Sequence, residues 1–153
     1  MALLAKLLLI VPGSMSTIFI PSGSFCLIID TDVARAALKT LYNHLNDDGV
    51  FLFEVETLQN VPPLDVWRGS VWHKSNGQII MLTQLDTMKD NVCYSIGKYE
   101  LIDNNSIIHT EIEELKVRIY DQDGLEELLK SSGFKDIRVI EAFEQSIVYE
   151  CRK

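Results

Sequence analysis

The sequence predicts an α/β fold in which a parallel strand pair is followed by an antiparallel insertion. Two nearly continuous apolar segments, residues 17–20 and 50–55, have the composition of strands in a parallel sheet that is covered on both faces. A helical pattern separates them, and this strand–helix–strand order is typical of a parallel crossover. From residue 71 to residue 120 apolar residues alternate with polar ones, which favours antiparallel strands. We therefore expect a three-layer core that carries an antiparallel meander.

The helix between the two parallel strands has a clear start and a clear stop in the sequence. Asp30, Thr31 and Asp32 can each cap its N-terminus, and all three remain candidates. The apolar residues that recur at helical spacing are Ala34, Ala37, Leu38, Leu41 and Leu45. The polar run at residues 46–49 predicts the end of the helix, directly before the second strand.

The meander contains two alternating segments, residues 78–86 and 92–101, and a third that ends near residue 120. The Asp-Asn-Asn sequence at residues 103–105 predicts the turn between the last two. In the third segment the apolar residues change parity after Ile112, so we expect a β-bulge at Glu113 and Glu114.

The C-terminal part of the sequence predicts a short helix followed by two strands. Leu125, Leu128 and Leu129 give the helix its apolar face, Asp121 or Asp123 begins it, and Gly133 closes it. The two strands are expected at residues 137–140 and 146–150.

Composition limits the possible functions. The 153 residues are 47% hydrophobic and 24% charged, so they can bury a core, and we expect one domain over residues 1–153 with the insertion at 67–120. The net charge is −8, from 14 basic and 22 acidic residues. An acidic protein is poorly suited to neutralising phosphates, so we expect neither a nucleic-acid partner nor an anionic membrane partner.

Cysteine and histidine usage indicates a reduced, cytoplasmic protein without a bound metal. Cys26, Cys93 and Cys151 are far apart and form no CxxC pair, and the three histidines fall in different predicted elements. The apolar segment at residues 2–11 is about half the length needed to span a bilayer. It also has no signal-peptide cleavage pattern, so we expect a buried helix or strand there.

Two nucleotide-binding motifs are excluded because no two glycines are closer than eight residues, which leaves no GxGxxG and no P-loop. Ser22 and Ser24 lie in no GxSxG, so a plain turn is favoured over a nucleophile there. Glu54 and Glu56 flank the carboxyl end of the second strand, where open α/β sheets bind ligands. Of the two, the sequence favours Glu56 as a functional residue. The alternative is that Glu56 only caps or pairs with a neighbouring group.

The order of these segments resembles the central part of class I S-adenosylmethionine-dependent methyltransferases. The segments that carry the resemblance are FIPSGSF at residues 19–25, the helix end and turn at 41–49, VFLFEVET at 50–57, and the tail from Arg118 through SGF at 132–134. Trp67 or Trp72 followed by an antiparallel insertion resembles the small-molecule subgroup that includes sugar N,N-dimethyltransferases. The resemblance covers residues 16–153.

This resemblance implies a partial Rossmann-like methyltransferase core, S-adenosylmethionine as cofactor and a small-molecule acceptor. Glu56 would be the catalytic residue, with Thr57 beside it. The implied cofactor-binding residues are Ile20, Pro21 and Ser22, and the implied substrate-binding residues are Gly23, Ser24, Phe25, Trp67, Arg118 and Tyr120. The glycine-rich loop and the acidic residue by which the family holds its cofactor have no counterpart before residue 16. We therefore expect the C-terminal two-thirds of a methyltransferase, with weak or lost cofactor binding.

A second class of function stays open at this point. The chain could be a non-catalytic α+β module that binds a ligand or a partner through the meander. That hypothesis predicts no affinity for S-adenosylmethionine and a homodimer built on an exposed sheet edge.

Overall fold

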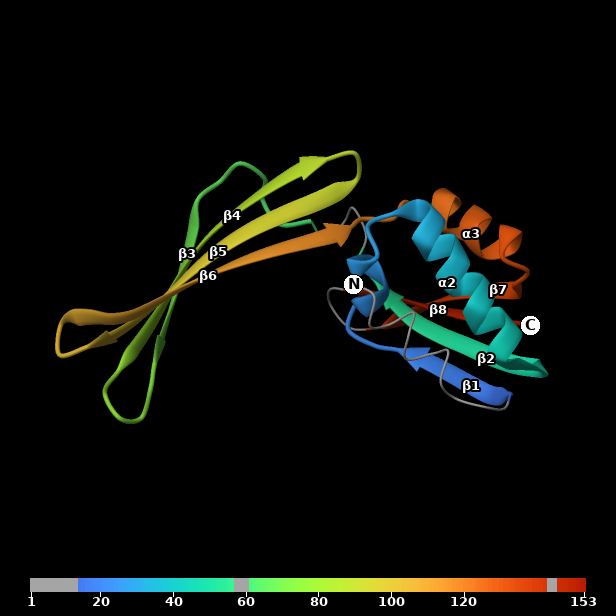
Figure 1. Ribbon diagram of the computed structural model, residues 1–153, viewed down its shortest axis with the longest axis horizontal. Helices are drawn as coiled ribbons and strands as arrows, with labels where there is room; N and C mark the ends of the chain where they lie inside the picture. The colour runs from blue at the N-terminus through green and yellow to red at the C-terminus, as the bar shows by residue number, and fades with distance from the viewer. Residues whose placement is uncertain (1–13, 57–60, 143–145) are drawn as a thin grey trace. The chain divides into compact units, whose positions relative to one another are not determined.

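The computed structural model describes residues 14–56, 61–142 and 146–153, and it divides them into two compact units. One unit combines the described residues up to Glu56 with Val117–Lys153, and the other is Val61–Lys116. Each unit has its own four-stranded sheet (Figure 1). The apolar segment at residues 2–11 and Thr57, for which the sequence makes predictions, lie outside the described residues.

The first unit is built on a sheet with the strand order β1-β2-β8-β7. Its elements are β1 (Met15–Ile20), the 3₁₀ helix η1 (Ser24–Leu27), α2 (Thr31–His44), β2 (Leu45–Val55), α3 (Gln122–Ser131), β7 (Lys135–Ala142) and β8 (Ser146–Arg152). β1 and β2 run parallel, as expected for strands joined by the α2 crossover. β8 is antiparallel to both of its neighbours, β2 and β7.

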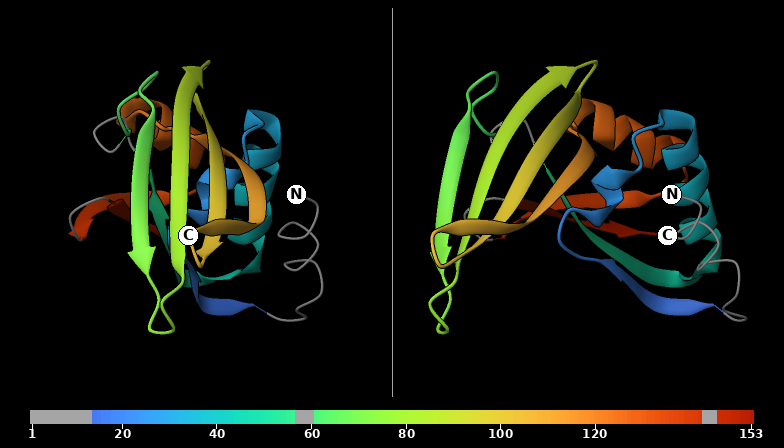
Figure 2. Two further views of the ribbon diagram at one scale, coloured as in Figure 1. Left: turned by 90° about the vertical axis from the view of Figure 1, so that its left-hand side faces the viewer. Right: turned by 60° about the vertical axis from the view of Figure 1, so that its left-hand side comes forward.

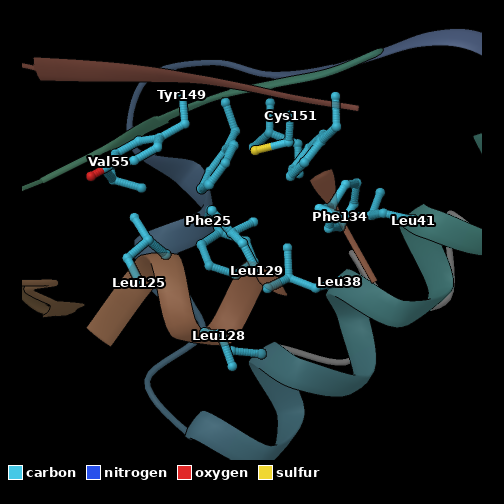
Figure 3. Close-up of a cluster of buried hydrophobic side chains, with 14 of the residues drawn as sticks. Phe25, Leu38, Leu41, Val55, Leu125, Leu128, Leu129, Phe134, Tyr149 and Cys151 are labelled. Carbon is cyan, nitrogen blue, oxygen red and sulfur yellow. The ribbon is translucent and has the colours of Figure 1, made fainter. Parts of the chain in front are cut away.

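Both described helices contribute to one hydrophobic core on one face of this sheet, as Figures 1 and 3 show. Along β2, Phe51, Phe53 and Val55 are buried, whereas Leu52 and Glu54 between them are only partly buried. Within the described residues α2 and α3 cover one face of the sheet, which gives two layers. The third layer that the apolar Leu52 suggested stays a prediction.

Aromatic side chains fill the centre of this core. The rings of Phe51 and Phe53 are stacked with their centroids 4.6 Å apart. Phe25 meets Phe53 edge to face at 5.4 Å, and Phe134 approaches Phe51 at 5.5 Å. Figure 3 shows Phe25 and Phe134 between the sheet and the two helices. Residues far apart in the sequence thus hold η1, β2 and the C-terminal segment together.

The start of α2 agrees with the sequence, but its end does not. Asp30 is the N-cap, and its Oδ1 accepts hydrogen bonds from the backbone amides of Asp32 at 2.9 Å and Val33 at 3.0 Å. The helix ends at His44 and β2 begins at once with Leu45, so residues 46–49 are part of the strand. Leu45 pairs with Met15, and an irregularity in the β1–β2 ladder accommodates the extra residues of β2.

Replacing Asp30 with alanine is expected to lower the free energy of unfolding by about 1 kcal/mol, because two amide groups of α2 lose their acceptor. Urea denaturation followed by circular dichroism measures the change. Asp47→Ala, an exposed position in β2, is the matched control and should change stability by less than about 0.5 kcal/mol. Equal losses for both variants would contradict the capping role.

The sequence predicted both ends of α3. Asp121 is the N-cap and accepts a hydrogen bond from the Gly124 amide at 2.7 Å. Gly133 follows the C-cap residue Ser132 with φ +109°, a conformation that favours glycine. A Cβ at this glycine would lie 3.1 Å from the ring of Tyr42, so close packing also favours glycine here.

The second unit is an antiparallel sheet with the order β3-β4-β5-β6, which confirms the expected meander. Its strands are β3 (Arg68–His73), β4 (Ile79–Lys89), β5 (Val92–Asp103) and β6 (Ser106–Arg118), and they form a twisted sheet (Figure 2). Asp90 with Asn91, and Asn104 with Asn105, have positive φ values of 47–58° and make the two tight hairpin turns. β6 is assigned as one continuous strand, and the bulge at Glu113 and Glu114 stays a prediction.

Within the described residues, no helix is both long and apolar enough to cross a membrane. The three cysteines are buried and carry free thiols. Burial raises the pKa of Cys26 and of Cys151 to about 12, so both thiols are protonated at neutral pH.

Candidate functional site

The loop that follows β1 is a tight turn at the carboxyl end of the parallel strand pair. Ser22 and Gly23 both have left-handed backbone conformations, with φ of 56° and 61°. The backbone amide of Ser24 donates a hydrogen bond to the carbonyl oxygen of Pro21 at 3.2 Å, and its hydroxyl donates to the same oxygen at 2.8 Å. The turn therefore presents Ser22 and Gly23 at the sheet edge where α/β folds bind ligands.

Two carboxylates lie against this turn: Glu54 belongs to β2, and Glu56 directly follows the strand. Glu54 accepts a hydrogen bond from the backbone amide of Ser22. The Glu56 side chain packs against Gly23 so closely that a Cβ at the glycine would lie 3.3 Å from Glu56 Oε1. The glycine is needed here for its positive φ as well as for this close approach.

The environment of Glu56 favours its protonated form. Partial burial raises the pKa of the Glu56 carboxyl group, and the negative charge of Glu54 raises it further. Two carboxylates at one sheet edge can hold an ammonium group between them, or one of them can accept a proton from a bound amine.

Two aromatic side chains, Phe25 and Tyr120, pack together next to the turn. Phe25 is fully buried, and the ring of Tyr120 stacks on it with a centroid separation of 5.8 Å. The amide of Tyr120 donates to the carbonyl oxygen of Glu56 at 3.4 Å, and the amide of Glu56 donates to Cys26 Sγ at 3.2 Å. These bonds connect the end of β2 to η1 on one side and to the segment after β6 on the other.

The hydroxyl of Tyr120 is a buried polar group that has no hydrogen-bond partner in the described part of the chain. Burial raises its pKa, and the neighbouring Cys26 raises it further. The group is therefore a neutral phenol at physiological pH, and its donor hydrogen is available to a ligand.

The remaining predicted site residues lie in different surroundings. Arg118 donates from Nε to the carbonyl oxygen of Ile29 at 2.6 Å, which fixes its side chain near the start of α2. The Ile20 side chain is 8% exposed and belongs to the core, whereas Pro21 is exposed. Trp67 lies in the second unit and is 62% exposed.

The structure thus brings together most of the predicted residues in the first unit: Pro21, Ser22, Gly23, Ser24, Phe25, Glu56 and Tyr120. Sequence reasoning gave Glu54 less weight than Glu56 and did not select Cys26. The signal for Glu54 was its position two residues before Glu56. Residues two apart along a strand point to the same face, so the two side chains are expected on one face. Nothing in the sequence around Cys26 indicates its bond to Glu56.

The combination of a parallel β1–β2 pair, an antiparallel C-terminal strand pair and an antiparallel insertion matches part of the Rossmann-like fold seen in solved S-adenosylmethionine-dependent methyltransferases. Solved structures show this likeness, whereas no protein-family model and no curated protein matches the sequence.

Three solved structures illustrate the likeness. An S-adenosylmethionine-dependent methyltransferase from Clostridium acetobutylicum is 18% identical with a TM-score of 0.71, over 93% of this chain and 59% of its own. An amino pentose methyltransferase of calicheamicin biosynthesis from Micromonospora echinaspora is 12% identical with a TM-score of 0.78, over 94% of this chain and 60% of its own. A sugar N-methyltransferase from a Streptoalloteichus species is 11% identical with a TM-score of 0.75, over 94% of this chain and 57% of its own.

The chain therefore spans about three-fifths of the length of the methyltransferase structures that it resembles. At these identities the likeness defines the fold, and the chemistry has to be argued from the site.

Proposed function

We propose that this chain forms the acceptor side of an S-adenosylmethionine-dependent methyltransferase that acts on an amine-containing small molecule. The observation that carries the proposal is the Glu54 and Glu56 pair beneath the Ser22–Gly23 turn, at the carboxyl end of the parallel strands. Two of the similar structures are an amino pentose methyltransferase and a sugar N-methyltransferase, which supports an amine acceptor.

The residues of this edge suit methyl transfer to nitrogen. S-adenosylmethionine would supply an electrophilic methyl group, so that the nitrogen–carbon bond would form as the carbon–sulfur bond breaks, with S-adenosylhomocysteine as the leaving group. The nitrogen must lose a proton, and the ionised Glu56 carboxylate would accept it. Glu54 would hold the turn through the Ser22 amide and keep the pKa of Glu56 raised, closer to the pH at which the base works.

The other predicted residues have complementary roles in the proposal. Ile20, Pro21 and Ser22 would border the cofactor. Gly23, Ser24, Phe25 and Tyr120 would form the wall of the acceptor pocket, with the buried Tyr120 hydroxyl as a donor. Trp67 and Arg118 are proposed as further acceptor contacts.

The proposal is tested by methyl transfer in a chimera. The portion of the amino pentose methyltransferase that this chain does not cover is joined to this chain, and the chimera is incubated with S-adenosylmethionine and a panel of small amines and alcohols. Mass spectrometry is expected to detect methylated amines, with S-adenosylhomocysteine formed in equal amount. A correctly folded chimera that binds S-adenosylmethionine and methylates none of the amines would refute the proposal.

The isolated chain is expected to bind S-adenosylmethionine at least about 100-fold more weakly than the amino pentose methyltransferase does. The reason is that its sequence has no GxGxxG loop with which to hold the cofactor. Isothermal titration calorimetry of both proteins under one set of conditions measures the difference. A micromolar dissociation constant for the isolated chain would show that the glycine-rich loop is not required.

A further inference from the structure

The sheet of the second unit carries a cavity of about 180 Å³ that the proposed function does not use. The residues that line it come from β4, β5 and β6: Gln84, Ser95, Gly97, Tyr99, Glu113 and Leu115. Cross-strand pairing of Gln84 with Gly97 places β4 and β5 side chains on the same face here. Gly97 has no side chain, and the side chains of Leu82 and Tyr99 approach it so closely that a Cβ there would lie 3.3 Å from Leu82 Cδ1 and 3.6 Å from Tyr99 Cε2.

A buried carboxylate organises the polar end of this cavity. Asp86 is fully buried and forms an ion pair with Arg68. It also accepts hydrogen bonds from the Ser95 hydroxyl and from Gln84 Nε2, the latter at 3.0 Å. The hydrogens of Ser95 and Gln84 are therefore directed towards Asp86, and these two residues present acceptor oxygens to any ligand.

Glu113 adds a carboxyl group to the same cavity. In the described part of the chain Glu113 takes part in none of the four ion pairs. The lysines of the neighbouring strands are engaged elsewhere: Lys98 pairs with Glu100 at 3.0 Å, and Lys116 lies over the ring of Tyr94. Lys98, Glu100 and Tyr94 alternate with the cavity residues along β5, so they lie on the opposite face of the sheet.

We propose that this cavity is a binding site for the ammonium group of a small hydroxylated amine. Glu113 supplies the opposite charge, and Gln84 and Ser95 supply acceptor oxygens for the ammonium hydrogens and the neighbouring hydroxyl groups. The Tyr99 ring offers an aromatic surface for the cation or for the C–H groups beside it. This binding requires neither a cofactor nor Glu56.

The test is a titration of the full 153-residue chain with a small amine, followed by ¹H–¹⁵N NMR. D-glucosamine is the probe, and D-glucose is the neutral analogue of the same shape. Glucosamine is expected to shift the Gly97 amide saturably with a dissociation constant of about 1 mM, and glucose to bind at least about 10-fold more weakly.

Two matched variants assign the binding to the cavity. Glu113→Gln should weaken glucosamine binding by about 10-fold. Glu114→Gln removes the same charge from the next position of β6, which does not line the cavity, and should change the affinity by less than about 2-fold. Both positions are exposed, so the fold is expected to persist, and the NMR spectra report it.

Three results would each overturn the proposal: no saturable shift at Gly97, equal affinity for glucose and glucosamine, or equal losses in the two variants. Since no S-adenosylmethionine is present, these outcomes are independent of the methyl-transfer proposal. Failure of the chimera to methylate amines would leave the glucosamine result unchanged.

Discussion

Replacing Glu56 with glutamine in the active chimera is expected to lower the turnover number for methyl transfer by about 100-fold or more, the usual contribution of a general base. Glutamine keeps the size of the side chain and its packing against Gly23, but it cannot accept the proton of the amine. The dissociation constant for S-adenosylmethionine should change by less than about 2-fold. Steady-state kinetics and calorimetry on the same preparations provide both values.

Two outcomes would change the role assigned to Glu56. If turnover is unchanged, Glu56 has no part in the proton transfer. If the affinity for S-adenosylmethionine falls sharply instead, Glu56 belongs to the cofactor side of the site.

Glu54→Gln in the same chimera is the comparison for Glu56→Gln. Its expected effect is on the pH dependence of kcat/KM. The charge of Glu54 raises the pKa of Glu56, so removing that charge lowers this pKa. A base works only when it is ionised, and a lower pKa leaves it ionised at lower pH. The acid limb of the kcat/KM profile should therefore move to lower pH in Glu54→Gln, and an unmoved limb would show that the limb does not report Glu56.

Phe51→Ala is expected to lower the free energy of unfolding by about 3–5 kcal/mol. The Phe51 side chain is 0% exposed and touches the rings of both Phe53 and Phe134, so truncation removes contacts and leaves a cavity. Urea denaturation of the whole chain, followed by near-ultraviolet circular dichroism, measures the loss. A loss of this size would leave little of the stability typical of a small protein.

Phe19→Ala is the control for this measurement. Phe19 is the same residue type, lies in the neighbouring strand β1 and is 55% exposed. Its truncation should cost less than about 1 kcal/mol. Similar losses for the two variants would mean that the face of the sheet opposite α2 and α3 also depends on buried contacts.

Local chemistry in the sequence predicted much of the fold. Asp30 and Asp121 cap helices because a short carboxylate can reach the free amides of the first turn, and the Asn-Asn pair at residues 104–105 turns the chain because asparagine tolerates positive φ. The same local chemistry made the prediction for residues 46–49 wrong, because they were expected to end the helix as a turn and they belong to β2. These residues favour a turn in isolation, but pairing between β1 and β2 extends the strand back to Leu45.

The candidate site was predictable only where it follows a topological rule. Glu56 could be found because ligands bind at the carboxyl ends of parallel strands. The stacking of Tyr120 on Phe25 depends on contacts between residues almost a hundred positions apart, and no local pattern encodes them. Asp86 was equally hidden, because its partners Arg68 and Ser95 come from two other strands whose register the sequence does not reveal.

The strand order β1-β2-β8-β7 also sets the order of events during synthesis. One edge of β2 pairs with β1, which is synthesised before β2. The other edge pairs with β8, which is synthesised after all the other described strands. In the meantime the hairpins of the second unit, which are local in sequence, can form within about 1–10 μs, whereas translation adds only about 5–20 residues per second. Nascent chains that stop before Ser146 therefore expose an unpaired β2 edge, and such intermediates are the ones that a chaperone or a protease should recognise.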